Sequence, residues 1–255
     1  LAESLQSTAD AADGADSVTT TGGDVALILG GGADTTMLGD GLVYALADDG
    51  TLTVTPNDDY SGRQVELTSA ESLQVANDDT VTTGDGEALV IGGEGADSVT
   101  SGAGEHVIVG DDGTINRDTR SGDTVLSATS AHTAEDGDDT VTLGDGGHVA
   151  VLGGGADSLT AGDGGSLVLG DSGAVSRDPG STSATTSDPG TGGGDAIVMG
   201  TGDDVVLAGD GADSVTGGEG ANLVAGDGAL YSRDLAADVL DFETRDPGTG
   251  AGDTI

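Results

Sequence analysis

The chain has 255 residues and a formal net charge of −41, with 47 acidic residues against six arginines and no lysine. It contains 49 glycines, no cysteine, no tryptophan, one phenylalanine and three tyrosines. This composition excludes disulfide bonds, disfavours a nucleic-acid partner and leaves no run of about 20 apolar residues that could span a membrane. So much charge with so few large side chains is typical of disorder, unless the carboxylates are neutralised.

The first residues do not follow the regular repeat. Ala-Glu-Ser-Leu-Gln at residues 2–6 recurs at residues 70–74, just ahead of a later regular block. We therefore expect the chain to begin inside a repeat. From Asp16 onward a nine-residue period governs the sequence, seen most clearly where Asp139-Thr-Val-Thr is followed 18 residues later by Asp157-Ser-Leu-Thr. Nine residues fit one turn and one short strand. Two nonapeptides thus predict one coil, of about 18 residues, in an all-β parallel β-roll (β-solenoid).

Position 8 of each nonapeptide is the expected core position, counting the repeated aspartate as position 6. Only Thr36 departs from apolar character there. The expected core residues are Val18, Leu27, Thr36, Ala45, Val81, Val90, Val99, Ile108, Val141, Ala150, Leu159, Val168, Ile197, Val206, Val215 and Val224.

Longer superrepeats organise these coils into a single predicted solenoid over residues 1–255. The leading aspartates Asp79, Asp139, Asp195 and Asp253 are spaced 60, 56 and 58 residues apart. We expect about three coils in each superrepeat, two regular and one irregular. The predicted superrepeats are 16–76, 79–138, 139–194 and 195–252, with a further one starting at residue 253.

Irregular insertions recur every 56–63 residues between the regular blocks. Residues 50–55 and 64–68 alternate like half-exposed strands. The later insertions carry turn signals such as Asp178-Pro-Gly180 and Asp188-Pro-Gly190, which predict loops projecting from one side of the roll. Residues 229–245, which contain Phe242, suggest a short helix.

Aspartates locked to one phase of the repeat are the candidate metal ligands. The second aspartate of each block ends a Gly-x-Gly-x-Asp turn, in which glycine permits a positive φ and inward-facing carbonyls. Carboxylates from stacked coils and turn carbonyls together supply the six to eight oxygens that calcium prefers. A halophilic surface is an additional interpretation of the acidity, but it does not explain the phase. The candidate aspartates are Asp16, Asp34, Asp79, Asp97, Asp139, Asp157, Asp195 and Asp213.

These turns resemble the glycine- and aspartate-rich nonapeptides of RTX proteins, Gly-Gly-x-Gly-x-Asp-x-(apolar)-x. The likeness covers somewhat more than half of the chain. In that family the turns bind calcium, the strands form a parallel β-roll, and the roll folds outside the cell after secretion. The resemblance therefore implies Ca²⁺ ligands at the eight aspartates and at the turn glycines Gly32, Gly95, Gly155 and Gly211.

The opposite edge departs from this pattern. Its position 6 reads Val25, Val43, Ala88, His106, His148, Ser166, Asp204 and Asn222, so Asp204 alone is a candidate ligand there and the edge should be largely bare. Position 3 instead carries Asp40, Asp85, Asp145 and Asp163, for which we favour capping of turn N–H groups over calcium binding.

Two further residue types invite a functional interpretation. We expect His106 and His148 to be polar turn residues, because a transition-metal site would need further nitrogen or sulfur ligands. Four arginines precede an aspartate and either tie the projecting loops to the acidic roll or form exposed ion pairs of little energetic weight. These arginines are Arg117, Arg177, Arg233 and Arg245.

The function expected from these features is structural. We predict a calcium-stabilised segment of a secreted or surface-attached extracellular repeat protein, forming a fibre, stalk or surface layer. Its expected partners are neighbouring copies or further repeats stacked end to end, with a surface glycan or protein as a further candidate. The alternative is a ligand-binding adhesin module that uses the projecting loops. A polysaccharide-modifying enzyme on a β-helix comes third; no catalytic motif is present, so we predict no enzyme.

Overall fold

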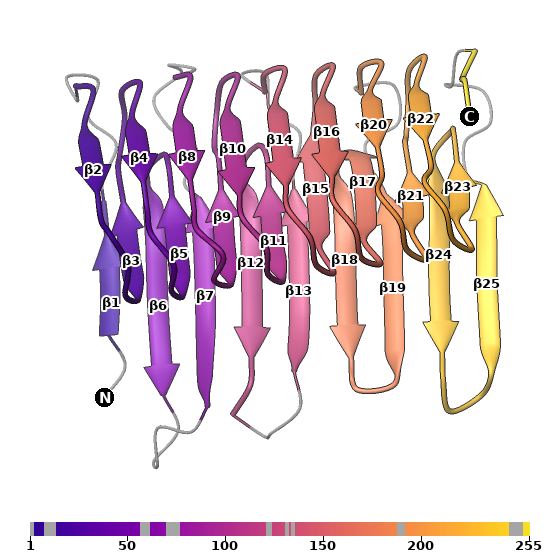
Figure 1. Ribbon diagram of the computed structural model, residues 1–255, viewed down its shortest axis with the longest axis horizontal. Coiled ribbons are helices and arrows are strands. Elements are labelled where there is room, and N and C mark those ends of the chain that lie inside the picture. The colour runs from indigo at the N-terminus through magenta and orange to yellow at the C-terminus, as the bar shows by residue number, and fades with distance from the viewer. Residues whose placement is uncertain are drawn as a thin grey trace.

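The computed structural model describes residues 3–7, 14–56, 62–69, 77–120, 124–130, 133, 136–187, 192–244 and 252–255. Within these residues the chain is all-β and forms no helix, so it contains no helix that could cross a membrane. The strands belong to three sheets, which we call sheets A, B and C (Figure 1).

Sheets B and C are parallel, and the chain visits them alternately. Sheet B consists of β2 (Ser17–Thr19), β4 (Thr35–Met37), β8 (Thr80–Thr82), β10 (Ser98–Ser101), β14 (Thr140–Leu143), β16 (Ser158–Ala161), β20 (Ala196–Val198) and β22 (Ser214–Thr216). Sheet C consists of β3 (Val25–Ile28), β5 (Val43–Leu46), β9 (Ala88–Ile91), β11 (His106–Val109), β15 (Val149–Gly153), β17 (Leu167–Asp171), β21 (Val205–Leu207) and β23 (Leu223–Ala225).

The register of these sheets follows the nonapeptide period. Val141 pairs with Leu159, and Ala150 with Val168, each 18 residues further on. Position 8 points into the layer between sheets B and C, and every residue expected there is buried or, at Val18, Leu27 and Val224, half-buried. The predicted core is therefore confirmed, including Thr36, which is 1% exposed.

Sheet A is antiparallel and consists of the insertions. Its strands are β1 (Glu3–Gln6), β6 (Gly50–Pro56), β7 (Arg63–Ser69), β12 (Gly113–Asp118), β13 (Val125–Ser130), β18 (Gly173–Asp178), β19 (Ser181–Thr186), β24 (Ala229–Asp234) and β25 (Val239–Thr244). The strands expected at 50–55 and 64–68 are confirmed as β6 and β7. The loops expected in the later insertions are instead hairpins that pair with one another, and Gly180 (φ 108°) forms the turn between β18 and β19.

Sheet A packs against sheet C and gives the molecule a third layer. Leu52, Leu67 and Ile115 of sheet A belong to the same buried cluster as Leu89 and Ile91 of sheet C. Sheet C is thus covered on both faces, which explains why its strands are apolar at consecutive positions rather than at alternate ones. The burial of all four residues of β9 and of β5 shows this directly.

A superrepeat does not consist of the three coils that the sequence led us to expect. From β8 to β13 the chain adds two strands to each of the three sheets. The irregular third of the superrepeat is therefore a hairpin of sheet A and not a coil. At about 4.8 Å per strand, each superrepeat lengthens the molecule by about 10 Å.

The short helix suggested at residues 229–245 is wrong. This segment forms β24 and β25, joined by a turn at 235–238. Pairing with β19 satisfies the backbone of β24, and alternation buries Ala229 and Tyr231 against sheet C. Three predictions fall outside the described residues: the repeat at 70–74, the turn at 188–190 and the Arg245-Asp246 pair.

Candidate metal centre

The predicted aspartates line one edge of the molecule, where the chain passes from sheet C to sheet B. Each backbone N–H in this column donates to a carboxylate oxygen of the next coil, over N···O distances of 2.6 to 3.1 Å. We call this column the buried ladder. It comprises Asp16, Asp34, Asp79, Asp97, Asp139, Asp157, Asp195, Asp213 and Asp253. The two aspartates at its ends are not buried: Asp16 is exposed and Asp253 is half-buried.

The glycine turns allow the coils to stack at the spacing of this ladder. Gly32, Gly95, Gly155 and Gly211 have φ between 110° and 122°, as the Gly-x-Gly-x-Asp pattern predicts. A Cβ on Gly155 would overlap the backbone of Gly137 in the adjacent coil. Glycine is thus required there both for its conformation and for the close approach.

One carboxylate oxygen of most ladder aspartates is left without a hydrogen-bond partner. Asp139 and Asp157 are each 2% exposed, and their Oδ2 atoms are buried and unpaired. The same holds for Oδ2 of Asp79, Asp97, Asp195 and Asp213. A buried carboxylate without a counter-charge is costly, so these groups must take up a proton or a cation.

The pKa values of the ladder reflect this burial. Burial, reinforced by the charge of Asp139, raises the pKa of Asp97 to about 10 and that of Asp157 to about 9. Burial raises the pKa of Asp139 itself to about 8. The pKa of Asp213, near the end of the ladder, rises less, to about 6.

The donors of the ladder suit a hard divalent cation. Gly92, Gly110 and Gly170 lie against the Oδ2 atoms of Asp97, Asp139 and Asp195, where a Cβ would overlap the carboxylate. The described residues gather no group of three or more His, Asp or Glu side chains that could hold a metal. An ion here would therefore depend on one or two carboxylates together with main-chain carbonyls and water, a donor set that calcium accepts.

Asp204 lies away from the other candidate ligands, on the opposite edge. Asp204 is 1% exposed. Its carboxylate Oδ1 accepts from Ser166 N at 2.9 Å, and its backbone N–H donates to Asn222 Oδ1 at 3.0 Å. Burial raises the pKa of Asp204 above its usual range. The C-terminal half of this edge thus carries a hydrogen-bonded column of Ser166, Asp204 and Asn222. The sequence predicted an edge largely bare of calcium ligands, with Asp204 as the exception.

His106 and His148 belong to the same opposite edge. They are 1% and 0% exposed, with rings stacked at 5.1 Å, and each Nε2 bonds the carbonyl of Gly102 or Gly144. Burial lowers the pKa of both imidazoles. They are buried stacking residues rather than simple turn residues.

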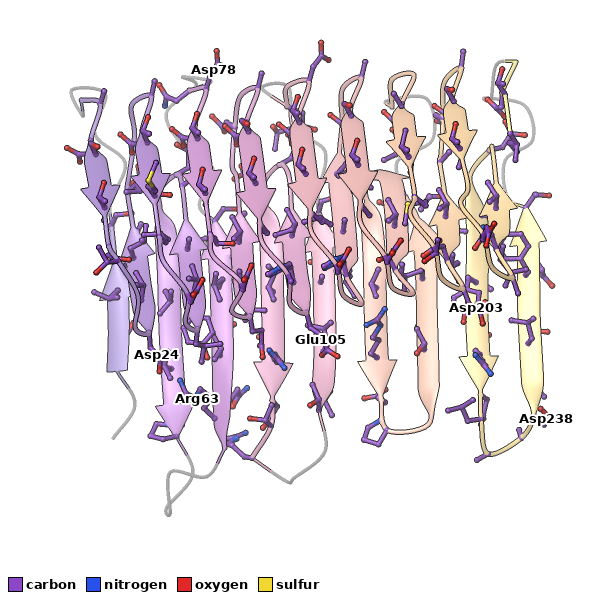
Figure 2. The ribbon with its side chains drawn as sticks, in the orientation of Figure 1. Asp24, Arg63, Asp78, Glu105, Asp203 and Asp238 are labelled. Carbon is purple, nitrogen blue, oxygen red and sulfur yellow. The ribbon has the colours of Figure 1, made fainter. Side chains whose placement is uncertain are left out.

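The position-3 aspartates cap turns, as expected. Asp40 accepts from Asp85 N at 3.0 Å, and Asp145 accepts from Asp163 N at 2.9 Å. Further exposed aspartates do the same on both edges; Asp78 lies at the ladder edge, and Asp24 and Asp203 lie at the opposite one (Figure 2).

The arginines of the described strands lie in sheet A, on the far side of sheet C from sheet B. Arg117 pairs with Glu87, and Arg177 Nη2 lies 3.5 Å from His148 O, so both connect sheet A to the edge of sheet C. Arg120 forms an ion pair with Asp118 near the surface. Among the described residues, neither of the two ion pairs neutralises a ladder aspartate.

Several further buried aspartates were missed by the sequence reasoning, and one of them recurs at the same place before three successive hairpins. Asp48 and Asp111 follow β5 and β11, and Asp171 is the last residue of β17. All three precede the hairpins, and their exposures are 2%, 0% and 4%. We call them the junction aspartates. The recurrent signal was present as Asp48-Asp-Gly50, Asp111-Asp-Gly113 and Asp171-Ser-Gly173, but it lies outside the nonapeptide phase.

Comparison of this chain with family models, curated proteins and solved structures found no match.

Proposed function

We propose that this chain is a calcium-stabilised structural segment of an extracellular repeat protein. Sheets B and C are the two walls of a parallel β-roll in this proposal, and sheet A reinforces one wall. The resemblance of the Gly-x-Gly-x-Asp turns to RTX nonapeptides supports calcium as the ion and secretion as the route. Neighbouring copies or further repeats would continue the stack of coils.

The observation that carries the proposal is the buried ladder. Its carboxylates lie one coil apart, about 4.8 Å, and each accepts a backbone N–H that fixes its position. Within the part of the chain that the structure describes, no cationic side chain pairs with the free oxygens of Asp139 and Asp157. Bound calcium supplies the positive charge that this edge lacks, while the aspartates and turn glycines hold its ligands in register.

Calcium should therefore be required for folding, because binding energy to the folded state alone adds to its stability. We expect circular dichroism in chelator and low salt at alkaline pH, where the ladder aspartates are ionised, to show disorder, and millimolar calcium to restore β structure. Magnesium at the same concentration is the matched control and should restore less, because it prefers strict octahedral geometry.

Two other outcomes separate the competing interpretations. A chain that is equally folded in excess chelator and low salt contradicts the proposal. Folding restored by molar sodium chloride without calcium supports the halophilic interpretation instead.

A further inference from the structure

The junction aspartates lie against the buried ladder. Gly110, which precedes Asp111, contacts Asp139, because a Cβ on this glycine would overlap Asp139 Oδ2. Gly170, which precedes Asp171, stands in the same relation to Asp195 Oδ2. Ala47 precedes Asp48, and here burial and then the charge of Asp79 raise the pKa of Asp48 to about 8, which places these two aspartates near each other as well.

Each junction aspartate is also held by the following glycine turn. Glu94 N donates to Asp48 Oδ2 at 2.8 Å, Gly154 N donates to Asp111 Oδ2 at 2.5 Å, and Asp210 N donates to Asp171 Oδ2. The donor follows a glycine of positive φ in every case, namely Gly93, Gly153 and Gly209. Because the arrangement is the same at three junctions, the position of the junction carboxylate is fixed by the fold.

Oxygens at these junctions are buried without partners. Oδ1 of Asp48 and of Asp171 has no hydrogen bond, and neither has Oδ2 of the adjacent Asp79 and Asp195. All four residues are between 2% and 4% exposed. Each of these junctions thus holds two buried carboxylates, and a divalent cation is the species that cancels both charges.

The ladder consequently has two kinds of position. Leading aspartates, such as Asp139, have a junction carboxylate beside them, since Asp111 follows Gly110. Asp97, the second aspartate of its block, lies against Gly92, which is followed by Gly93 and not by an acid. Among the neighbouring charges, Asp48 acts on Asp97 less than Asp139 and Asp79 do. Charge count is one of the features that set calcium affinity, so the two kinds of position should differ in affinity.

We propose that the pairs Asp48–Asp79, Asp111–Asp139 and Asp171–Asp195 form a separate, tighter class of divalent-cation site, with one ion at each junction between superrepeats. This inference rests on the proposed function. It adds calcium ligands that lie outside the nonapeptide repeat. Because these ligands directly precede the hairpins of sheet A, bound ions would lie where each hairpin begins.

Calcium binding to the whole chain tests the proposal. We expect equilibrium dialysis across buffered free-calcium concentrations, with bound calcium counted by atomic spectroscopy, to resolve two classes of site. Asp111→Asn should remove one ion from the tight class, and Asp111→Asn with Asp171→Asn should remove two. Asparagine retains the oxygen that accepts the turn N–H. At Asp111 it gives up only the long bond, 3.4 Å, that Oδ1 accepts from Gly137 N, so the fold should persist at saturating calcium, as circular dichroism would show.

Asp138→Asn is the matched control, because Asp138 is exposed beside Asp139 and only caps Ala156 N at 2.8 Å. It should leave both classes unchanged. A single class in the unsubstituted chain, or full tight binding in Asp111→Asn and Asp171→Asn, overturns the inference; if one variant does not fold, the other decides. Absence of any calcium binding by the unsubstituted chain would instead refute the proposed function itself.

Discussion

At the scale of single residues, the buried ladder sets two requirements against each other. Its N–H···O bonds favour a carboxylate at each step, whereas burial and the neighbouring charges oppose ionisation. Asp97 illustrates the conflict, since it accepts from Asp79 N at 2.7 Å while its pKa rises to about 10 through burial and the charge of Asp139. The conflict ends when a proton or a cation is bound.

The stability of the calcium-free chain should therefore fall as pH rises. The folded-state pKa values are about 7 for Asp195, about 8 for Asp139 and about 9 for Asp157, all above the unfolded value of about 3.9. Such groups contribute stability that is complete below pH 4 and is lost as pH rises through 7 to 9. Chelator-treated chain followed by circular dichroism between pH 4 and pH 9 checks this. Saturating calcium should reverse the trend, because protons then compete with the ion.

The two edges should respond unequally to truncation in calcium. Asp157→Ala removes a buried acceptor of Asp139 N at 2.7 Å and a proposed calcium ligand, and should cost at least about 1–3 kcal/mol for the orphaned N–H. Ser166→Ala removes only the 3.3 Å bond from His148 N and should cost less. Isothermal titration and calcium-loaded melting compare the two variants. Equal loss of calcium from both would show that the ladder edge is not the binding edge.

At the scale of elements, the central position of sheet C makes the hairpins part of the fold. Ile115 of β12 is fully buried against sheet C, whereas its neighbour Asn116 lies on the other face of sheet A. Ile115→Ala should lower the free energy of unfolding by about 2–5 kcal/mol. Asn116→Ala, the matched control, should change it by about 0.5 kcal/mol or less. Calcium-saturated thermal unfolding measures both, and equal melting temperatures would show that the hairpins do not pack on sheet C.

The regular blocks could be predicted from sequence because their constraints are local. An apolar side chain at position 8 predicts a core residue, as at Val141, and a Gly-x-Gly-x-Asp pattern predicts a tight turn, as at Gly155. The hairpins could not be assigned in the same way. Each hairpin strand pairs on one side within its own hairpin and, where it has a second neighbour, on the other side with a neighbouring superrepeat, as β13 pairs with β12 and with β18. Ser/Thr-rich segments such as residues 181–186 also carry little apolar signal of their own.

The junction aspartates were missed for a related reason. Asp111 acquires its role only when residues 153–154, about 40 positions later in the sequence, fold over its carboxylate. An Asp-Asp-Gly sequence is also an ordinary turn signal. The ladder aspartates, by contrast, recur at one position of the nonapeptide and could therefore be recognised from the sequence.

At the scale of the whole molecule, the proposed stacking of copies has a dimensional signature. Residues 253–254 already continue sheet B, since Thr254 bridges Ser214 and Asp253 accepts from Asp213 N. Each added superrepeat should lengthen a fibre by about 10 Å. Electron microscopy of the full-length protein in calcium should show thin fibres or long rods with this repeat. Short monodisperse particles from a full-length protein of this size would contradict end-to-end stacking.

The direction of the strands has a mechanical consequence. Strands lie across the long axis, so the hydrogen bonds between neighbouring strands run along it, and the two ends of the chain lie at opposite ends of that axis (Figure 1). Tension between the ends therefore pulls on the bonds of one coil at a time instead of shearing many together. A released coil of 18 residues grows from about 4.8 Å to about 60 Å. Under load the molecule would therefore lengthen stepwise, starting from its outermost coil, and would act as an extensible tether.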